Sequence, residues 1–233
     1  MWKWFSRRSS NPAVQFAKDV EEARQATQAE LRRQLTVSTE QLDQIAMHLV
    51  AEMDRGARAP GMTLAMLPSY VTGRVTGREV GTYYALDLGG TNLRVCEVKL
   101  NGDGTPSLQH QRFVIPQSAM TGHADNLFDF IAESTGEFLR KRGTVAGATE
   151  EAVLGFTFSF PFVANSIDSG ILTHWTKGFC TKGVEGMDVV QLLQAAFVRH
   201  NLKAKVVCII NDTVGTLVAH AYAHPKTEMG VIM

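Results

Sequence analysis

The chain contains 233 residues, of which 45% are hydrophobic and 20% are charged. This composition supplies enough apolar material for a folded core and excludes a chain that is disordered over most of its length. Its 23 basic residues balance 23 acidic residues, so the net charge favours neither nucleic acid nor an acidic partner. No apolar run approaches the roughly 20 residues that a membrane-spanning helix requires, so we expect no membrane span.

The cysteine and histidine spacings indicate neither a disulfide framework nor a metal site. The three cysteines, Cys96, Cys180 and Cys208, contain no C-x-x-C pair, and the first and last lie in apolar runs. Reduced thiols in a cytoplasmic protein are therefore the better interpretation. His220 and His224 are four residues apart but lack the remaining ligands of a zinc site, so we expect no protein-held metal.

The N-terminal part of the chain has a helical pattern. Residues 1–10 lack the apolar core of a secretory signal and predict a frayed terminus, with a short membrane-surface or organelle-targeting arm as the alternative. Residues 11–55 predict helices, and Ser38 or Thr39 can cap a second helix. Repeated Gly and Pro then predict a loop-rich connector over residues 56–82.

The most informative segment is residues 84–95, which read YALDLGGTNLRV. Apolar residues alternate on both sides of Gly89-Gly90, which predicts two half-buried strands joined by a tight turn. Glycines let backbone N–H groups approach an anion, and hydroxyl, amide and guanidinium donors follow at Thr91, Asn92 and Arg94. The position of Asp87 suits a phosphate-bound Mg²⁺. We interpret the segment as a phosphate-binding hairpin, and the alternative is an ordinary hairpin whose glycines serve only the turn.

The rest of the chain alternates between strand and helix patterns. Strands are predicted at residues 111–115, 152–158 and 205–210. Helices are predicted at residues 125–141 and 187–200. This interleaving predicts the α/β class.

Two of these strands end in polar residues that suit a ligand site. Ser159 follows the strand at 152–158, and Asn211 and Asp212 follow the strand at 205–210. Ligands of open α/β sheets gather at the carboxyl ends of strands. A carboxylate there can accept the proton of a hydroxyl that attacks phosphorus, so Asp212 is a candidate general base. The alternatives are strand-end punctuation for Ser159 and an N-cap for Asp212, just before a small-residue helix.

A loop at residues 172–179 combines an aromatic ring, a hydroxyl, an ammonium group and a flexible glycine, at Trp175, Thr176, Lys177 and Gly178. Such a loop suits a polyhydroxylated ligand, because Thr and Lys can donate to hydroxyls while Trp anchors the loop in the core. In the alternative, Trp175 only packs and Lys177 is solvated.

Four segments, in this order, resemble the eukaryotic-type hexokinase family: LDLGGTNLRV, GFTFSFP, WTKGF and INDTVGTL. The resemblance covers nearly the whole chain. It implies an α/β, actin-like ATPase (ribonuclease H-like) fold of two lobes, with sugar in the cleft and ATP and Mg²⁺ against the glycine hairpin. The implied activity is ATP-dependent phosphorylation of the 6-hydroxyl of glucose and related hexoses such as fructose or mannose.

Site residues carry over by position from this resemblance. The ATP phosphate loop corresponds to Asp87, Gly89, Gly90, Thr91, Asn92 and Arg94. The sugar site corresponds to Ser159, Thr176, Lys177, Asn211 and Asp212, with Asp212 as the general base. Arg112 aligns loosely with a lysine that relatives direct toward the nucleotide.

The resemblance also divides the chain. It implies an N-terminal tail and helical lead-in at residues 1–67, a hexokinase small lobe at 68–211 and the start of a large lobe at 212–233. In the family, a strand like the one predicted at residues 228–233 precedes a second glycine-rich turn, two sugar-binding glutamates and the adenosine pocket. We therefore expect an N-terminal portion with an incomplete large lobe and little activity of its own.

Two other functions are compatible with parts of this pattern. A non-catalytic, hexokinase-like sugar sensor or regulatory protein is the main alternative to the kinase. Another actin-like ATPase is disfavoured, because the WTKGF and FSFP segments would then have no sugar to hold.

Overall fold

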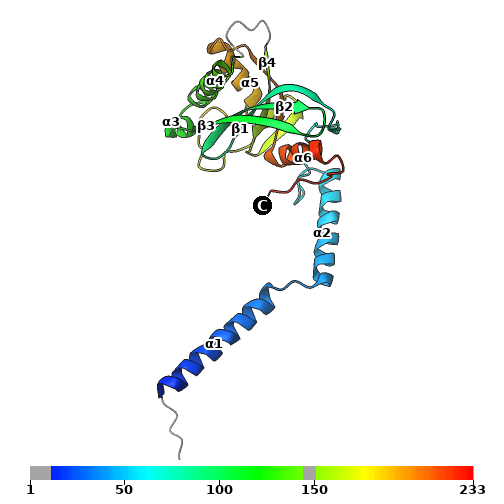
Figure 1. The fold of residues 1–233 in the computed structure, drawn as a ribbon, viewed down its shortest axis with the longest axis vertical. Coiled ribbons are helices and arrows are strands. Elements are labelled where there is room, and N and C mark those ends of the chain that lie inside the picture. Colours follow the sequence, from blue (N-terminus) through cyan, green and yellow to red (C-terminus); the bar gives the residue numbers. More distant parts are fainter. Residues whose placement is uncertain (1–11, 144–150, 233) are drawn as a thin grey trace, which may run out of the picture. The chain divides into compact units, whose positions relative to one another are not determined.

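The computed structural model describes residues 12–143 and 151–232, so the predicted frayed arm at residues 1–10 lies outside the described residues. The chain divides into two compact units, Met1–Met66 and Leu67–Met233, and each has its own secondary structure (Figure 1). Within the described ranges, no helix is long and apolar enough to cross a bilayer.

The first unit contains two helices, α1 (Pro12–Leu35) and α2 (Thr39–Arg58). The predicted cap at Ser38 is confirmed: its hydroxyl accepts the Gln41 N–H at 3.2 Å, and the Ser38 N–H donates to the Gln41 side chain at 2.9 Å. This reciprocal pair is a capping box, which satisfies two donors that the start of a helix would otherwise leave unpaired. The helices predicted within residues 11–55 are therefore confirmed.

The second unit is built on a five-stranded sheet with the order β3-β2-β1-β4-β7. Its strands are β1 (Val80–Leu88), β2 (Asn92–Asn101), β3 (Pro106–Val114), β4 (Ala152–Phe158) and β7 (Ala204–Ile210). The β1–β2 and β2–β3 pairs are antiparallel, whereas β1–β4 and β4–β7 are parallel. The three parallel strands β1, β4 and β7 therefore end at the same edge.

Helices cover both faces of this sheet. Figure 1 shows α4 (Ala124–Lys141) and α5 (Val189–Arg199) together on one side and α6 (Asp212–Ala223) on the other. The first side holds the core, whose largest fully buried side chains include Phe128, Phe156, Phe158, Phe160 and Phe197. The predicted α/β class is thus confirmed, as are the predicted helices and central strands, to within a few residues at their ends.

The connector from Ala59 to Glu79 contains no helix or strand, as the sequence predicted. Its end is held by Tyr222 of α6, whose hydroxyl donates to the Glu79 carbonyl and accepts the Gly102 N–H, both at 3.0 Å. One buried phenol therefore ties the connector and the β2–β3 turn to the end of α6.

Three parts of the fold differ from the sequence predictions. The strand expected at 111–115 is the end of a longer strand, because β3 pairs with β2 from Pro106 onward. A hairpin of β5 (Phe162–Ser166) and β6 (Ser169–Leu172), and the short helix α3 (Gln117–Thr121), were not predicted. The strand expected at 228–233 is wrong where the structure describes it, because residues 228–232 form no regular structure and pair with no strand there.

Candidate active site

The candidate residues that follow β1, β4 and β7 lie at one edge of the sheet. Leu88 pairs with Phe158 at the ends of β1 and β4, and Thr157 pairs with Ile210 near the ends of β4 and β7. The Ser159 N–H extends this ladder by donating to the Leu88 carbonyl at 3.4 Å. The parallel pairing therefore places Gly89, Ser159 and Asn211 at neighbouring strand ends.

The glycine turn is the predicted strand-turn-strand hairpin. The Gly89 N–H donates to the Asn92 carbonyl at 3.0 Å and closes the turn between β1 and β2. A Cβ on Gly90 would lie 3.2 Å from the Cβ of Lys177, so only glycine fits there without displacing the lysine. The Asn92 amide donates to the Thr91 hydroxyl at 2.7 Å. The turn and the WTKGF loop, about 90 residues apart in sequence, thus lie in contact.

Charged side chains flank the turn. Asp87 and Arg94 are directly opposite on β1 and β2, and the Arg94 guanidinium donates to Asp87 Oδ2 at 2.7 Å. Arg112 lies opposite Arg94 on β3 and donates to the Asn92 side-chain oxygen at 2.7 Å. Arg94 is thus paired with the carboxylate that the sequence assigned to magnesium, and Arg112 is fixed beside the turn.

The WTKGF loop is anchored by its tryptophan, as predicted. The Trp175 ring stacks on Phe179 at 5.1 Å between centroids and meets Phe160 edge-on at 4.9 Å, and its Nε1–H donates to the Thr181 carbonyl at 2.8 Å. Beyond it, the Phe179 N–H donates to the half-buried Thr176 carbonyl at 3.1 Å and closes a turn. The core therefore holds the base of the loop.

Lys177 is not simply solvated, which was the alternative predicted for it. Its side chain is exposed, but its ammonium lies 5.4 Å from the centroid of the Phe160 ring. This cation–π contact holds the charge over the ring of Phe160, the residue that follows Ser159, while the stem of the side chain lies against Gly90. Ser159 itself is 7% exposed.

Asn211, and not Asp212, is the N-cap of α6. The Asn211 side-chain oxygen accepts the Thr213 N–H at 3.2 Å and the Thr213 hydroxyl at 3.0 Å. Asp212 is the first residue of the helix, which corrects the capping alternative considered for it. Its half-buried carboxylate therefore lies at the positive end of the helix dipole without serving as the cap.

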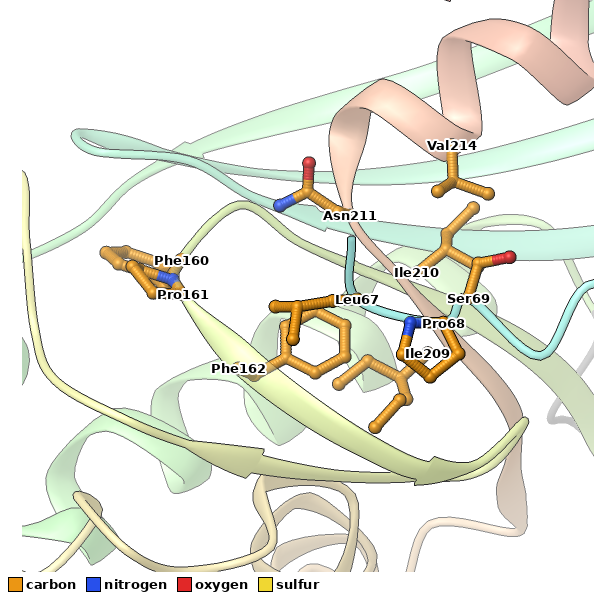
Figure 2. A pocket seen from close by; sticks show the side chains of 11 residues that line it. Leu67, Pro68, Ser69, Phe160, Pro161, Phe162, Ile209, Ile210, Asn211 and Val214 are labelled. Carbon is orange, nitrogen blue, oxygen red and sulfur yellow. The ribbon is translucent and has the colours of Figure 1, made fainter. Parts of the chain in front are cut away.

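An apolar pocket of about 210 Å³ adjoins this strand edge. Figure 2 shows Phe162 and Ile209 on its floor and the Asn211 amide at one end. The connector closes another side with Leu67 and Pro68. The Asn211 amide is thus positioned between polar strand ends and an apolar surface.

Sequence reasoning missed two residues that hold the WTKGF loop in place. The Thr181 hydroxyl is 2% exposed and donates to the Ala119 carbonyl at 2.9 Å. The Glu185 carboxylate accepts the Trp175 N–H at 2.7 Å. No spacing rule marks a glutamate that binds a backbone amide ten residues away.

Comparisons with known proteins agree with this geometry. A protein-family model described as Hexokinase matches residues 27–222. Hexokinase-2 of Candida albicans is 43% identical over 202 residues, which are 87% of this chain and 42% of that protein. Hexokinase-2 of Saccharomyces cerevisiae is 43% identical over 198 residues, which are 84% of this chain and 40% of that protein. The chain thus spans about two fifths of the length of these relatives.

Solved structures give the same result at the level of the fold. The structure of hexokinase from Schistosoma mansoni complexed with glucose has a TM-score of 0.66 and 40% identity, over 75% of this chain and 41% of that one. A second crystal structure of a hexokinase has a TM-score of 0.74 and 36% identity, over 81% of this chain and 46% of that one. The actin-like ATPase (ribonuclease H-like) fold implied by the motifs is therefore confirmed for the matched part, and the chain belongs to the hexokinase family.

Proposed function

We propose that this chain carries the part of a kinase active site that binds a hexose and transfers the γ-phosphoryl group of ATP to its 6-hydroxyl. One observation carries the proposal: the ends of β1, β4 and β7 bring the glycine turn, Ser159 and Asn211-Asp212 to one edge, with Lys177 against Gly90. Phosphate-binding and hydroxyl-binding groups thereby lie side by side, which is what in-line phosphoryl transfer requires.

The proposed hexose site consists of Ser159, Thr176, Lys177, Asn211 and Asp212. The Asn211 oxygen caps α6, so its amide N–H₂ is the group left to donate to a sugar hydroxyl. Lys177 supplies an ammonium donor whose position is restrained by the Phe160 ring. Few and well-positioned polar groups beside an apolar wall are typical of a small-molecule site.

Asp212 is the proposed general base. A carboxylate within hydrogen-bond reach of the 6-hydroxyl can accept its proton as the oxygen attacks phosphorus. Its place at the first turn of α6 holds this negative charge near the unpaired N–H groups of the helix start. Asn211, one residue earlier, fixes the backbone from which Asp212 projects.

The proposed ATP phosphate site is formed by Asp87, Gly89, Gly90, Thr91, Asn92 and Arg94. These residues fit a magnesium-bound phosphate chain, since Thr91 and Arg94 offer hydrogen-bond donors and Asp87 offers carboxylate oxygen, a ligand type that magnesium prefers. Bound Mg²⁺ would neutralise charge on the transferred phosphoryl group. The hairpin contributes backbone N–H groups, and Arg94 contributes a guanidinium that Asp87 now orients.

The proposal includes a division of the chain into a helical lead-in at residues 1–67, a small lobe at 68–211 and the start of a large lobe at 212–233. It also includes a cytoplasmic location and the use of fructose or mannose as substrates. The curated relatives are more than twice as long as the region that they share with this chain. We therefore propose that the 233 residues by themselves turn over slowly.

Calorimetry with glucose tests the proposed site directly. We expect the wild-type chain to release heat on binding glucose, and Lys177→Ala to weaken binding while the exposed control Lys203→Ala does not. Equal binding by all three chains would remove Lys177 from the sugar site. Release of ADP at a normal kinase rate, when MgATP and glucose are both present, would contradict the proposed slow turnover.

A further inference from the structure

The WTKGF loop has a backbone that needs external support. Lys177 has a φ of +56°, and Gly178 has a φ of +81°. The left-handed region is accessible to glycine but costs a lysine free energy, so the surrounding structure must hold Lys177 there.

Contacts from other segments supply this support at three points. The Trp175 ring is held by the core and by the Thr181 carbonyl, and the Cys180 N–H donates to the Met120 carbonyl at 2.9 Å. The Trp175 backbone N–H donates to Glu185 at 2.7 Å. In the described part of the chain, it is the one backbone donor from residue 174 to 178 that has a protein acceptor. Glu185 therefore fixes the backbone immediately before Thr176 and Lys177.

Glu185 is an exposed glutamate whose carboxylate binds a backbone amide, as the carboxylate of Glu79 does at Thr76 and Gly77. Among the described residues it forms no salt bridge, whereas the exposed carboxylates of Glu30 and Asp54 pair with arginine. Its carboxylate instead binds a backbone amide, and hydrogen bonds to ionised groups are the stronger kind. A glutamate that served only solubility would not need this geometry.

Small shifts of this loop move its lysine against two other parts of the site. Lys177 Cβ lies 3.2 Å from the position that a Cβ on Gly90 would take, and Lys177 Nζ lies 5.4 Å from the centroid of the Phe160 ring, the residue after Ser159. A backbone displacement at Trp175 would therefore change the distance between the lysine charge and both the glycine turn and the sugar-facing strand end.

We propose that Glu185 is a positioning residue for hexose binding, whose carboxylate fixes the Trp175 backbone so that Thr176 and Lys177 face the sugar. This role rests on the proposed function of the site. It acts through hydrogen-bond geometry, not through the field of the negative charge.

Three substitutions separate geometry from charge. Glu185→Gln keeps the length and the acceptor oxygen but removes the charge, Glu185→Asp keeps the charge but shortens the side chain, and Glu185→Ala removes both. Glu133→Ala is the matched control, because that exposed glutamate lies on α4 and, among the described residues, has only His200 within ion-pair distance, at 3.9 Å. Glucose affinity is measured by calorimetry on the full chain, and hydrogen exchange is measured at the Trp175 amide.

We expect Glu185→Ala and Glu185→Asp to weaken glucose binding about tenfold, the effect of losing one hydrogen bond to an ionised group, and to speed exchange at Trp175. Glu185→Gln and Glu133→Ala should stay within about threefold of the wild type. If Glu185→Ala does not fold, the comparison of Glu185→Asp with Glu185→Gln is sufficient to test the proposal.

Two results would overturn the positioning role of Glu185 without contradicting the proposed hexose site. Wild-type affinity in Glu185→Asp together with a loss in Glu185→Gln would mean that charge, and not positioning, matters. Wild-type affinity in every variant would mean that the hydrogen bond serves only the fold. A wild-type chain that binds no glucose would contradict the hexose site itself, and the role of Glu185 with it.

Discussion

Gly89 and Gly90 are adjacent in sequence, but the space around them differs. A Cβ on Gly90 would lie 3.2 Å from Lys177 Cβ, whereas one on Gly89 would lie at an ordinary 3.6 Å from the Asn92 carbonyl oxygen. We therefore expect Gly90→Ala to displace Lys177 and weaken glucose binding about fivefold, at the low end of the cost of overpacking, since the turn is only half-buried. Gly89→Ala is the matched control and should bind glucose as the wild type does in the same titration. Equal losses in both variants would contradict the contact.

The three free thiols should react in an order set by burial. Cys180 is exposed, whereas burial raises the pKa of Cys96, with a smaller increase from the Asp87 charge, and burial also raises the pKa of Cys208. The thiolate is the reactive form, so a raised pKa lowers its population at neutral pH. We expect alkylation, followed by mass spectrometry, to label Cys180 first and the other two increasingly as pH rises. Cys180→Ser should remove the fast phase, and a remaining fast phase would contradict this order.

At the scale of elements, Asp188 joins α5 to the β5–β6 hairpin. Its carboxylate caps α5 through the Val190 N–H at 2.9 Å and accepts the Ser169 hydroxyl at 2.6 Å. Since α5 covers the sheet, we expect Asp188→Ala to lower the free energy of unfolding by about 2 kcal/mol, measured by urea denaturation. Asp168→Ala should cost much less, because in the part of the chain that the structure describes Asp168 accepts a hydrogen bond only from the Ser166 hydroxyl. A similar loss in both variants would assign the effect to the hairpin turn and not to the cap.

The elements that the sequence predicted well are those with a strong local pattern. The apolar run of β4 and the amphipathic face of α4 needed no tertiary information. The β5–β6 hairpin was missed because its strands have five and four residues, and the Phe162 ring and Ile209 packed against Gly170 become neighbours only in the folded chain. The strand predicted from the apolar run at residues 228–232 was wrong because local hydrophobicity alone does not make a strand. A strand also needs a pairing partner.

In the candidate site, too, local sequence patterns were predictive and tertiary contacts were not. The rule that ligands gather at the ends of parallel strands was enough to group Ser159 with Asn211. That rule gives no distance between the strand ends and the WTKGF loop, so the contact of Lys177 with Gly90 could not be predicted. The hydrogen bond from Trp175 to Glu185 depends on side-chain placement across ten residues of irregular backbone, for which the sequence carries no periodic signal.

At the scale of the whole molecule, the sheet edge of this chain contains the proposed phosphate-binding turn and the proposed base. The matched relatives are hexokinases that are more than twice as long as the matched region. A dry cleft around both substrates needs surfaces on two sides, and the edge described here supplies one.

A hybrid protein tests whether this edge can catalyse the reaction when the rest of a kinase is present. In the hybrid, this chain replaces the matched 202 residues of the Candida albicans Hexokinase-2. We expect it to phosphorylate glucose in a coupled ADP assay, and Asp212→Asn to lower kcat about 10²- to 10⁴-fold, the usual contribution of a general base, while glucose affinity stays within a few-fold. The exposed Asp168→Asn is the control for loss of a carboxylate. Retained turnover in Asp212→Asn would remove Asp212 from its role, and a folded hybrid that binds glucose without turnover would contradict the proposed transfer.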